Sequence, residues 1–266
     1  MSVLLNFGLW HSGSKLSYLR YLTFKTLRHF HPHSRIQLYT NNNFSKDGGI
    51  EDQDYVNPKK FEIDYMGKLK ELDVEIIRVD WFSKLSPNHQ SDRFRWRFLS
   101  EQSGFYLDTD QIILRSFKNL PLEKYKFIYS SYDIKSSFAQ SGHFSPVGVL
   151  GASKDSKIVA KISGALPRYF KANDYNCIGP LMFLDMEKKI DMSEGFNAPS
   201  KYFYPAAICD QMCKIFDGSL KLGEGFSAHW FGGFGPSQKF NRGYTEEFSQ
   251  KSQDSISVFL REKKII

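Results

Sequence analysis

Residues 104–114 read GFYLDTDQIIL, and this stretch decides the fold. An apolar run leads into Asp108 and Asp110 and a second apolar run follows, which predicts a buried strand, a charged tip and another strand. Two aspartates one residue apart at a strand end can both reach one hard cation from a single turn. A divalent ion with oxygen ligands makes such crowding of negative charge tolerable. The pair therefore predicts a metal site.

The segment before this strand has the spacing of a helix. Residues 91–103 (SDRFRWRFLSEQS) place aromatic residues one turn apart, with Ser91 as a candidate N-cap and Gly104 as a candidate stop. On such a helix Asp92 and Arg95 fall at i and i+3, so they lie on one face. The helix is expected to lead directly into the strand that carries the two aspartates.

Together these two segments resemble a known family. The pattern Ser-Asp-x-x-Arg followed by Gly-x-Tyr-Leu-Asp-x-Asp, within residues 91–114, resembles the DXD-containing retaining glycosyltransferases of the GT-A type. That group includes fungal Golgi mannosyltransferases, lactosylceramide α-galactosyltransferases, bacterial capsular polysaccharide enzymes and the glucosylating clostridial toxins. The resemblance implies an α/β fold with a Rossmann-like open mixed sheet flanked by helices.

The same resemblance implies roles for four acidic and basic residues. In the family, the helix Asp and Arg contact the donor sugar, which assigns that role to Asp92 and Arg95. The DXD pair, here Asp108 and Asp110, holds Mn²⁺, or Mg²⁺, against the donor diphosphate. The implied donor is a nucleotide sugar, most simply a UDP-sugar, and the implied transfer retains the anomeric configuration.

Two aromatic residues are candidates for the nucleotide end of that donor. Residues 3–7 predict a first buried strand, and Trp10 follows in the expected loop. An aromatic residue in this place stacks on the base in the resembling family, whereas packing under the loop is the alternative. Tyr106, on the strand that ends at the aspartates, is expected to line the base or ribose pocket.

Two further positions are candidates for the sugar end. Gly179 precedes a proline at the start of an apolar segment and resembles the family's Thr-Gly-Pro element, which lies against the donor sugar. Ile178 stands where that threonine would be, so only a backbone role transfers. Asn176 is a candidate for contact with sugar hydroxyls, and a helix cap is the alternative.

A late segment offers a third metal ligand. Residues 226–233 predict a strand that ends in His229 before a glycine pair, and the segment resembles the part of GT-A enzymes that supplies a further metal or diphosphate contact. A neutral imidazole can complete a set of two carboxylates and phosphate oxygens. A buried histidine bonded to backbone is the alternative. The glycines permit a loop that closes over phosphates.

Composition places these motifs in one large domain. The chain has 266 residues and 16% aromatic residues, so it can bury a sizeable interior. Residues 1–114 are expected to form the nucleotide-sugar half and residues 115–266 the acceptor side. The net charge of +7 suits an anionic partner such as a nucleotide diphosphate, an acidic glycan or a membrane surface. No nucleic-acid-binding motif is visible, so nucleic acid is not an expected partner.

Several features bear on where the protein acts. The cysteine count is odd, and no signal peptide or membrane-spanning run is visible, which favours a reducing, cytoplasmic compartment. The basic tail 261–266 suggests peripheral contact with the inner membrane surface, with a solvated helix as the default. His29, His31 and His33 are expected to form a solvated helix end. Residues 136–142 are a candidate lid or acceptor loop.

The predicted function is thus a metal-dependent hexosyltransferase acting on a glycan, lipid-linked or other hydroxyl acceptor. Two alternatives from other classes remain. One is a phosphohydrolase with Asp108 as nucleophile, although Ile112 replaces the expected Thr or Val and the motif lies in mid-chain. The other is a non-catalytic sugar-binding domain of the same fold. The donor sugar, the acceptor and the linkage cannot be inferred from the sequence.

Overall fold

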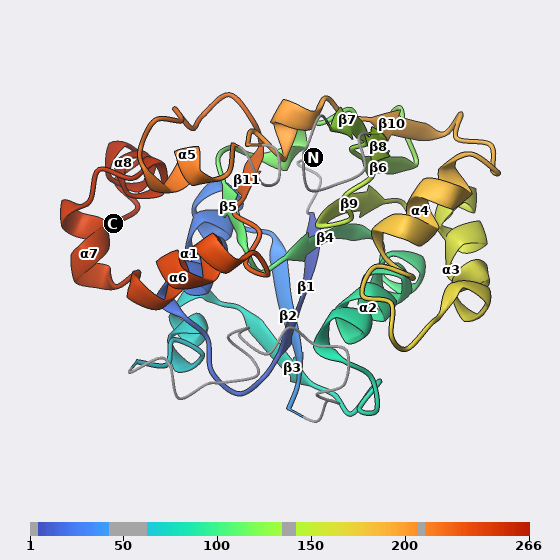
Figure 1. Ribbon diagram of the computed structural model, residues 1–266, viewed down its shortest axis with the longest axis horizontal. Helices are drawn as coiled ribbons and strands as arrows, with labels where there is room; N and C mark the ends of the chain where they lie inside the picture. Colours follow the sequence, from blue (N-terminus) through green and yellow to red (C-terminus); the bar gives the residue numbers. More distant parts are fainter. Residues whose placement is uncertain (1–4, 43–62, 135–141, 207–210) are drawn as a thin grey trace.

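A computed structural model describes residues 5–42, 63–134, 142–206 and 211–266. The strands of its central sheet are β1 (Asn6–Ser12), β2 (Arg35–Asn41), β3 (Glu75–Arg78), β4 (Gly104–Asp108), β6 (Phe127–Tyr129), β9 (Val149–Ala152) and β10 (Gly195–Asn197). They lie in the order β10-β6-β9-β4-β1-β2-β3 (Figure 1). Strand β1 is parallel to β2 and β4, and β9 is antiparallel to β4 and β6. The predicted open mixed α/β sheet is confirmed.

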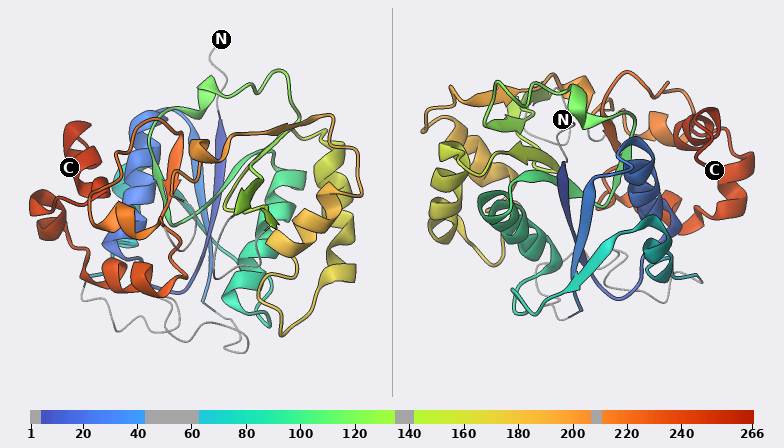
Figure 2. Two further views of the ribbon diagram at one scale, coloured as in Figure 1. Left: turned by 45° about the horizontal axis from the view of Figure 1, so that its top comes forward. Right: turned by 180° about the vertical axis from the view of Figure 1, so that it is seen from behind.

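Helices cover both faces of this sheet (Figures 1 and 2). The helices are α1 (Tyr18–Phe30), α2 (Pro87–Glu101), α3 (Lys157–Tyr169), α4 (Pro180–Glu187), α5 (Cys213–Phe216), α6 (Gly235–Gly243), α7 (Glu246–Lys251) and α8 (Ser255–Glu262), with 3₁₀ turns at Gly67–Leu72, Phe117–Asn119 and Ser200–Tyr202. Helix α1 lies on one side together with the C-terminal helices, and α2, α3 and α4 lie on the other. Side chains from both layers reach the end of β4, Arg20 from α1 and Arg95 from α2.

The alternation of side chains along β1 and β4 builds two cores. Leu9 and Leu107 are fully buried in the core on the α1 side. Their neighbours Trp10 and Tyr106 belong to the core under α2. This period of two is the expected pattern for strands that are covered on both faces.

Two short antiparallel pairs complete the chain. Strand β5 (Gln111–Ile113) pairs with β11 (Ser227–His229), and β7 (Tyr132–Ile134) pairs with β8 (Gly142–Phe144). The first pair brings the late segment beside the aspartate turn. Strands β7 and β8 of the second pair flank the predicted lid 136–142 in the sequence. Of that lid, only Gly142 belongs to the described residues.

Two predicted boundaries are wrong. The expected loop after residue 7 is strand as far as Ser12, because β1 has a parallel partner along its whole length and Ser12 is paired with Asn41. Helix α2 begins at Pro87 with Ser86 before it, so Ser91 is not its N-cap. Proline fits the first turn because no intrahelical acceptor is available to an N–H there.

The prediction that His29, His31 and His33 form a solvated helix end is wrong for His31. His31 is 1% exposed, and its Nε2 accepts the backbone N–H of Phe117 at 3.2 Å. Burial lowers the pKa of His31 to about 4, helped by the nearby cations Lys118 and Arg28. The imidazole is therefore neutral and part of the core, because the 3₁₀ turn at 117–119 covers the end of α1.

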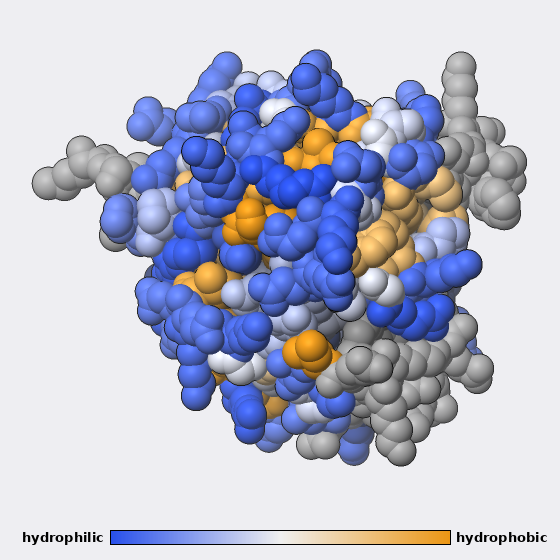
Figure 3. Space-filling model, turned by 90° about the vertical axis from the view of Figure 1, so that its left-hand side faces the viewer, coloured by the Kyte–Doolittle hydropathy of each residue, from blue (hydrophilic) through white to orange (hydrophobic). Residues whose placement is uncertain are grey.

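The apolar side of the C-terminal helix α8 is buried in the protein. Ile256, Phe259 and Leu260 of α8 are buried, and α8 packs against α5 and α7. Figure 3 shows the left-hand side of Figure 1, where the C-terminal helices lie, as a mainly hydrophilic surface with small separate apolar patches. Among the described residues, no helix combines the length and apolar character needed to cross a bilayer.

Candidate active site

The two aspartates lie at the tip of the central strand. Asp108 ends β4, and its backbone N–H donates to the Gly148 carbonyl at 2.8 Å. Asp110 follows in the turn before β5. Ligand sites in open α/β sheets lie outside the carboxyl ends of such strands. The local prediction of strand, charged tip and strand is confirmed.

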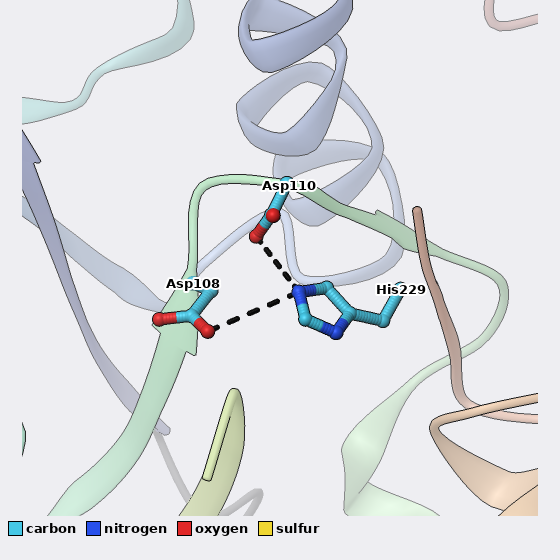
Figure 4. Close-up of side chains that lie close together, drawn as sticks. All are labelled: Asp108, Asp110 and His229. Carbon is cyan, nitrogen blue, oxygen red and sulfur yellow. Dashed lines mark hydrogen bonds and ion pairs between the residues drawn. The ribbon is translucent and has the colours of Figure 1, made fainter. Parts of the chain in front are cut away.

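His229 faces both carboxylates (Figure 4). Its Nε2 lies 2.9 Å from Asp110 Oδ1 and 3.9 Å from Asp108 Oδ2. One ligand atom from each residue can be chosen so that all three lie within 4.8 Å of one another. Pairing of β11 with β5 places His229 here, 119 residues from Asp110 along the chain. The structure therefore brings together the three residues that the sequence nominated as metal ligands.

Asp110 is enclosed by positively polarised groups. Besides His229, its Oδ2 accepts the Gly232 backbone N–H at 2.6 Å. Burial by itself would raise the pKa of Asp110. The His229 imidazole, the Arg20 guanidinium and the Gly232 N–H outweigh burial and hold that pKa well below its usual range. Asp110 is therefore a carboxylate throughout the physiological pH range.

Helix α1 supports the turn from below. Arg20 Nη1 donates to Thr109 Oγ1 at 2.7 Å, and the Thr23 hydroxyl donates to the Thr109 carbonyl at 2.7 Å. The Arg20 guanidinium also lies 5.3 Å from the centre of the Trp230 ring. Sequence reasoning missed Arg20 and Thr23. The two residues stand one turn apart on a helix that also carries Lys25, Thr26 and Arg28, so nothing in the local sequence singled them out.

The second part of the site is the ion pair on α2. Arg95 Nη2 lies 3.0 Å from Asp92 Oδ1 and 3.4 Å from Asp108 Oδ1, and Nη1 donates to the Val147 carbonyl at 2.9 Å. Asp92 and Arg95 are each 5% exposed. The predicted shared face of the helix is confirmed, and Arg95 joins it to the metal-ligand cluster.

Asp92 touches the backbone that precedes α4. A Cβ atom added at Gly179 would lie 2.6 Å from both carboxylate oxygens of Asp92, so glycine permits this approach. Burial raises the pKa of Asp92 to about 7; Arg95 lowers it and Asp108 raises it further. The structure thus brings Gly179 to Asp92, two residues that the sequence nominated for the same site. Asn176 lies three residues earlier, exposed in the turn, and its carbonyl accepts the Gly179 N–H at 3.2 Å.

Tyr106 stands behind Asp108. Its hydroxyl donates to Asp108 Oδ1, and it is hydrogen-bonded to Ser91 Oγ at 2.7 Å. The Arg95 guanidinium lies 4.7 Å from the centre of its ring. Tyr106 is fully buried and exposes no surface to a ligand. Its place in the base or ribose pocket stays a prediction. In this arrangement it orients Asp108.

Trp10 is packed into the α2 core. It is 4% exposed, its ring centre lies 5.2 Å from that of Phe94, and its indole N–H donates to Ser12 Oγ at 2.9 Å. Stacking on a base stays a prediction. Trp10 lies directly opposite Asp108 in the β1–β4 register, so it is close to the site in the sheet.

Comparison with known proteins agrees with this geometry. Residues 20–127 match the family described as the glycosyltransferase sugar-binding region containing a DXD motif. The match identifies this segment as a DXD-containing sugar-binding region of the glycosyltransferase type. The matched segment includes Asp92, Arg95 and the two aspartates of the motif. Comparison with curated protein sequences found no significant match.

Solved structures share the fold of this chain. The glycosyltransferase GlyE of Streptococcus pneumoniae TIGR4 superposes with a TM-score of 0.51 at 15% identity, covering 99% of this chain and 64% of that one. The bifunctional glycosyltransferase WbbM gives a TM-score of 0.50 at 11% identity, covering 99% of this chain and 50% of that one. The chain therefore spans less than two thirds of the length of either neighbour, and the likeness concerns the GT-A fold.

Proposed function

We propose that this chain is a metal-dependent glycosyltransferase that transfers a hexose from a nucleotide-diphosphate sugar, most simply a UDP-sugar, to a hydroxyl acceptor with retention. One observation carries the proposal. The Asp108–Asp110–His229 cluster is joined through Arg95 to Asp92. A metal site for a diphosphate and a carboxylate for sugar hydroxyls are thus adjacent parts of one site.

The donor atoms of the cluster fit Mn²⁺, or Mg²⁺. Two carboxylates supply hard oxygen ligands, and an imidazole nitrogen is a better ligand for manganese than for magnesium. His229 Nε2 lies 2.9 Å from Asp110 Oδ1, and because a carboxylate only accepts hydrogen bonds, Nε2 carries a proton in the metal-free chain. His229 Nδ1 is buried and has no hydrogen-bond partner among the described residues. When bound, the metal supplies Lewis-acid stabilisation of the departing diphosphate. Asp108, Asp110 and His229 would hold it.

At the sugar end, Asp92 would accept hydrogen bonds from donor hydroxyls. Arg95 fixes the position of Asp92 and adds a charge-assisted donor for a sugar or phosphate oxygen. The backbone at Gly179 would lie against the sugar, with Asn176 at the rim. Trp10 and Tyr106 are assigned to the nucleotide end of the donor. Trp10 would contact the nucleotide with the small part of its ring that is exposed, and Tyr106 would act by orienting Asp108.

Two buried donors in the segment that follows His229 suit the diphosphate. Trp230 Nε1 and Ser237 Oγ are buried and have no hydrogen-bond partner among the described residues. Ser237 lies in the first turn of α6, where free backbone N–H groups and the helix dipole favour anions. An unpartnered buried donor is costly, and a phosphate oxygen would remove that cost. Because Gly232, Gly233 and Gly235 have no side chains, the loop that contains them takes up little space.

Retention and the acceptor complete the proposal. The sugar–phosphate bond would break, and the bond to the acceptor oxygen would form on the same face. The departing phosphate oxygen would take the acceptor's proton, so a separate general base is not required. Residues 1–114 would bind the nucleotide sugar, and residues 115–266 would supply His229, Gly179 and the acceptor side. Anomeric configuration of the product, measured by NMR, distinguishes retention from inversion.

The decisive experiment screens a panel of nucleotide sugars for manganese-dependent donor hydrolysis. Asp110→Asn keeps the size of the side chain and removes its charge, so turnover should fall by a factor of about 10³ or more while the fold persists. Asp73→Asn is the matched control, since Asp73 is exposed in a left-handed conformation that asparagine also adopts. Unchanged turnover in Asp110→Asn contradicts the site assignment. Glycan binding without nucleotide, metal dependence or turnover would instead support the non-catalytic alternative.

A further inference from the structure

A cavity of about 690 Å³ lies between α3 and α4, on the parts of these helices that do not contact the catalytic cluster. Its apolar floor includes Ala165, Met186 and Ile190. Its rim carries Lys161, Arg168 and Lys189. The volume is within the range of sites that hold small ligands or headgroups. None of the residues that form the proposed donor site lines this cavity.

The rim is positively charged. The one acid that lines the cavity, Asp185, is held by Lys189 Nζ at 2.5 Å and accepts the Tyr169 hydroxyl. Lys161 and Arg168 have no ion-pair partner among the described residues, and both are exposed. Lys161 is partly balanced by Asp191, whose pKa is lowered by hydrogen bonds from Ser193 and, to a smaller extent, by Lys161. The rim still carries more basic than acidic side chains beside an apolar floor, which is complementary to an anionic group attached to an apolar body.

A glycine also lines the cavity. Gly164 lies in the middle of α3, where glycine costs up to about 1 kcal/mol relative to alanine. It is exposed, and a Cβ atom built there would meet nothing within 4 Å, so packing does not require the glycine. A long side chain at this position would have room to extend along the cavity wall.

We propose that this cavity binds the phosphate headgroup of anionic phospholipids at a bilayer surface. Lys161, Arg168 and Lys189 would contact phosphate oxygens, and the floor would cover the apolar part of the headgroup region. Leu181, which is 49% exposed, lies on the same face of α4 as Asp185, one turn nearer the site, and adds an apolar contact.

The placement connects the membrane with the transferase site. Helix α4 begins at Gly179–Pro180 beside Asp92, and its C-terminal part lines the cavity. Eight helical residues span about 12 Å, so a bilayer on this face lies near the sugar end of the site. Lipid-borne acceptors would then reach the site from the membrane. Membrane binding itself does not depend on the proposed transferase activity, so the two can fail separately.

The test is co-sedimentation of the whole chain with vesicles at physiological salt. Phosphatidylcholine vesicles containing roughly one quarter phosphatidylglycerol should bind it, and pure phosphatidylcholine should not. The variant Lys161→Gln/Arg168→Gln/Lys189→Gln should lose about a hundredfold in partition coefficient, since each basic residue near an anionic surface contributes roughly fivefold. The matched control Lys70→Gln/Lys84→Gln/Lys221→Gln removes the same charge from other exposed positions and should lose at most a few-fold.

A second variant separates the cavity from diffuse charge. Gly164→Gln places a neutral side chain along the cavity wall and should keep the melting temperature and donor hydrolysis in solution while reducing vesicle binding about tenfold. Three results overturn the proposal: no binding of the wild-type chain to anionic vesicles, equal losses in the cavity and control variants, or wild-type binding by Gly164→Gln. Thermal stabilisation by inorganic phosphate without vesicle binding would assign the cavity to a soluble anion and also overturn it.

Discussion

Asp110 and Asp92 are buried acids of the same site, but their surroundings shift their pKa values in opposite directions. Asp110 is surrounded by an imidazole, a backbone N–H and a guanidinium, and its pKa is held well below the usual range. Asp92 has one cation, Arg95, which does not outweigh burial, and its pKa rises to about 7. Burial alone therefore does not determine whether an acid is charged. The number of positive groups arranged around it does.

The largest expected effect comes from replacing Arg20, the buried cation beside Asp110. Arg20→Met should lower the free energy of unfolding by about 3–5 kcal/mol, because it leaves the buried Asp110 carboxylate less compensated and frees Thr109. Urea unfolding in EDTA measures this. Arg35→Met is the matched control, because the pair of Arg35 with Glu75 is about half exposed and its loss should cost less than about 1 kcal/mol. Equal losses in the two variants would contradict the special role of Arg20.

The Asp92 end should respond to pH. Its pKa is about 7 in the folded chain and 3.8 as a free carboxyl, so the folded state binds this proton more tightly. The associated stability is complete below about pH 4 and is lost as pH rises through 7, by about 4 kcal/mol. Asp92→Asn should abolish that part of the pH dependence in metal-free protein. It should also lose donor turnover.

Unfolding free energies at pH 5 and pH 8 in EDTA test this prediction. Asp73→Asn, an exposed acid replaced in the same way, should keep the wild-type pH dependence. If Asp92→Asn keeps the wild-type slope between these pH values, Asp92 does not titrate near neutrality. The low pKa of Asp110 predicts the opposite window for that residue, where stability is lost only on acidification below the ordinary carboxyl range.

A smaller effect is expected from the contact between Asp92 and the start of α4. Gly179→Ala places a methyl group 2.6 Å from both Asp92 oxygens and should displace the carboxylate. A misplacement of about 1 Å can lower turnover about a hundredfold. Steady-state rates with the preferred donor measure this loss, and the melting temperature should change little. Gly164→Ala is the control, because its methyl group meets open space, and it should raise stability by up to about 1 kcal/mol with unchanged turnover.

Sequence reasoning succeeded where the relation between residues is local. The helical spacing of Asp92 and Arg95 places them on one face, and the structure has them at 3.0 Å. It was less successful where a residue's neighbours come from elsewhere. Trp10 was expected in a loop, but β2 and β4 extend the strand past it and α2 covers it. His31 was expected in solvent, but a distant 3₁₀ turn covers it.

The sequence by itself determined that two carboxylates stand at the end of a buried strand. It also determined that Asp92 and Arg95 precede them on one face of a helix. Both follow from spacings within about one turn of backbone, which sterics and hydrogen bonding fix locally. Only the tertiary structure decided which groups surround the carboxylates. His229 and Gly232 are 119 and 122 residues away from Asp110 along the chain, and Arg20 lies on another helix. Those neighbours, brought in by strand pairing and core packing, determine whether each acid is charged.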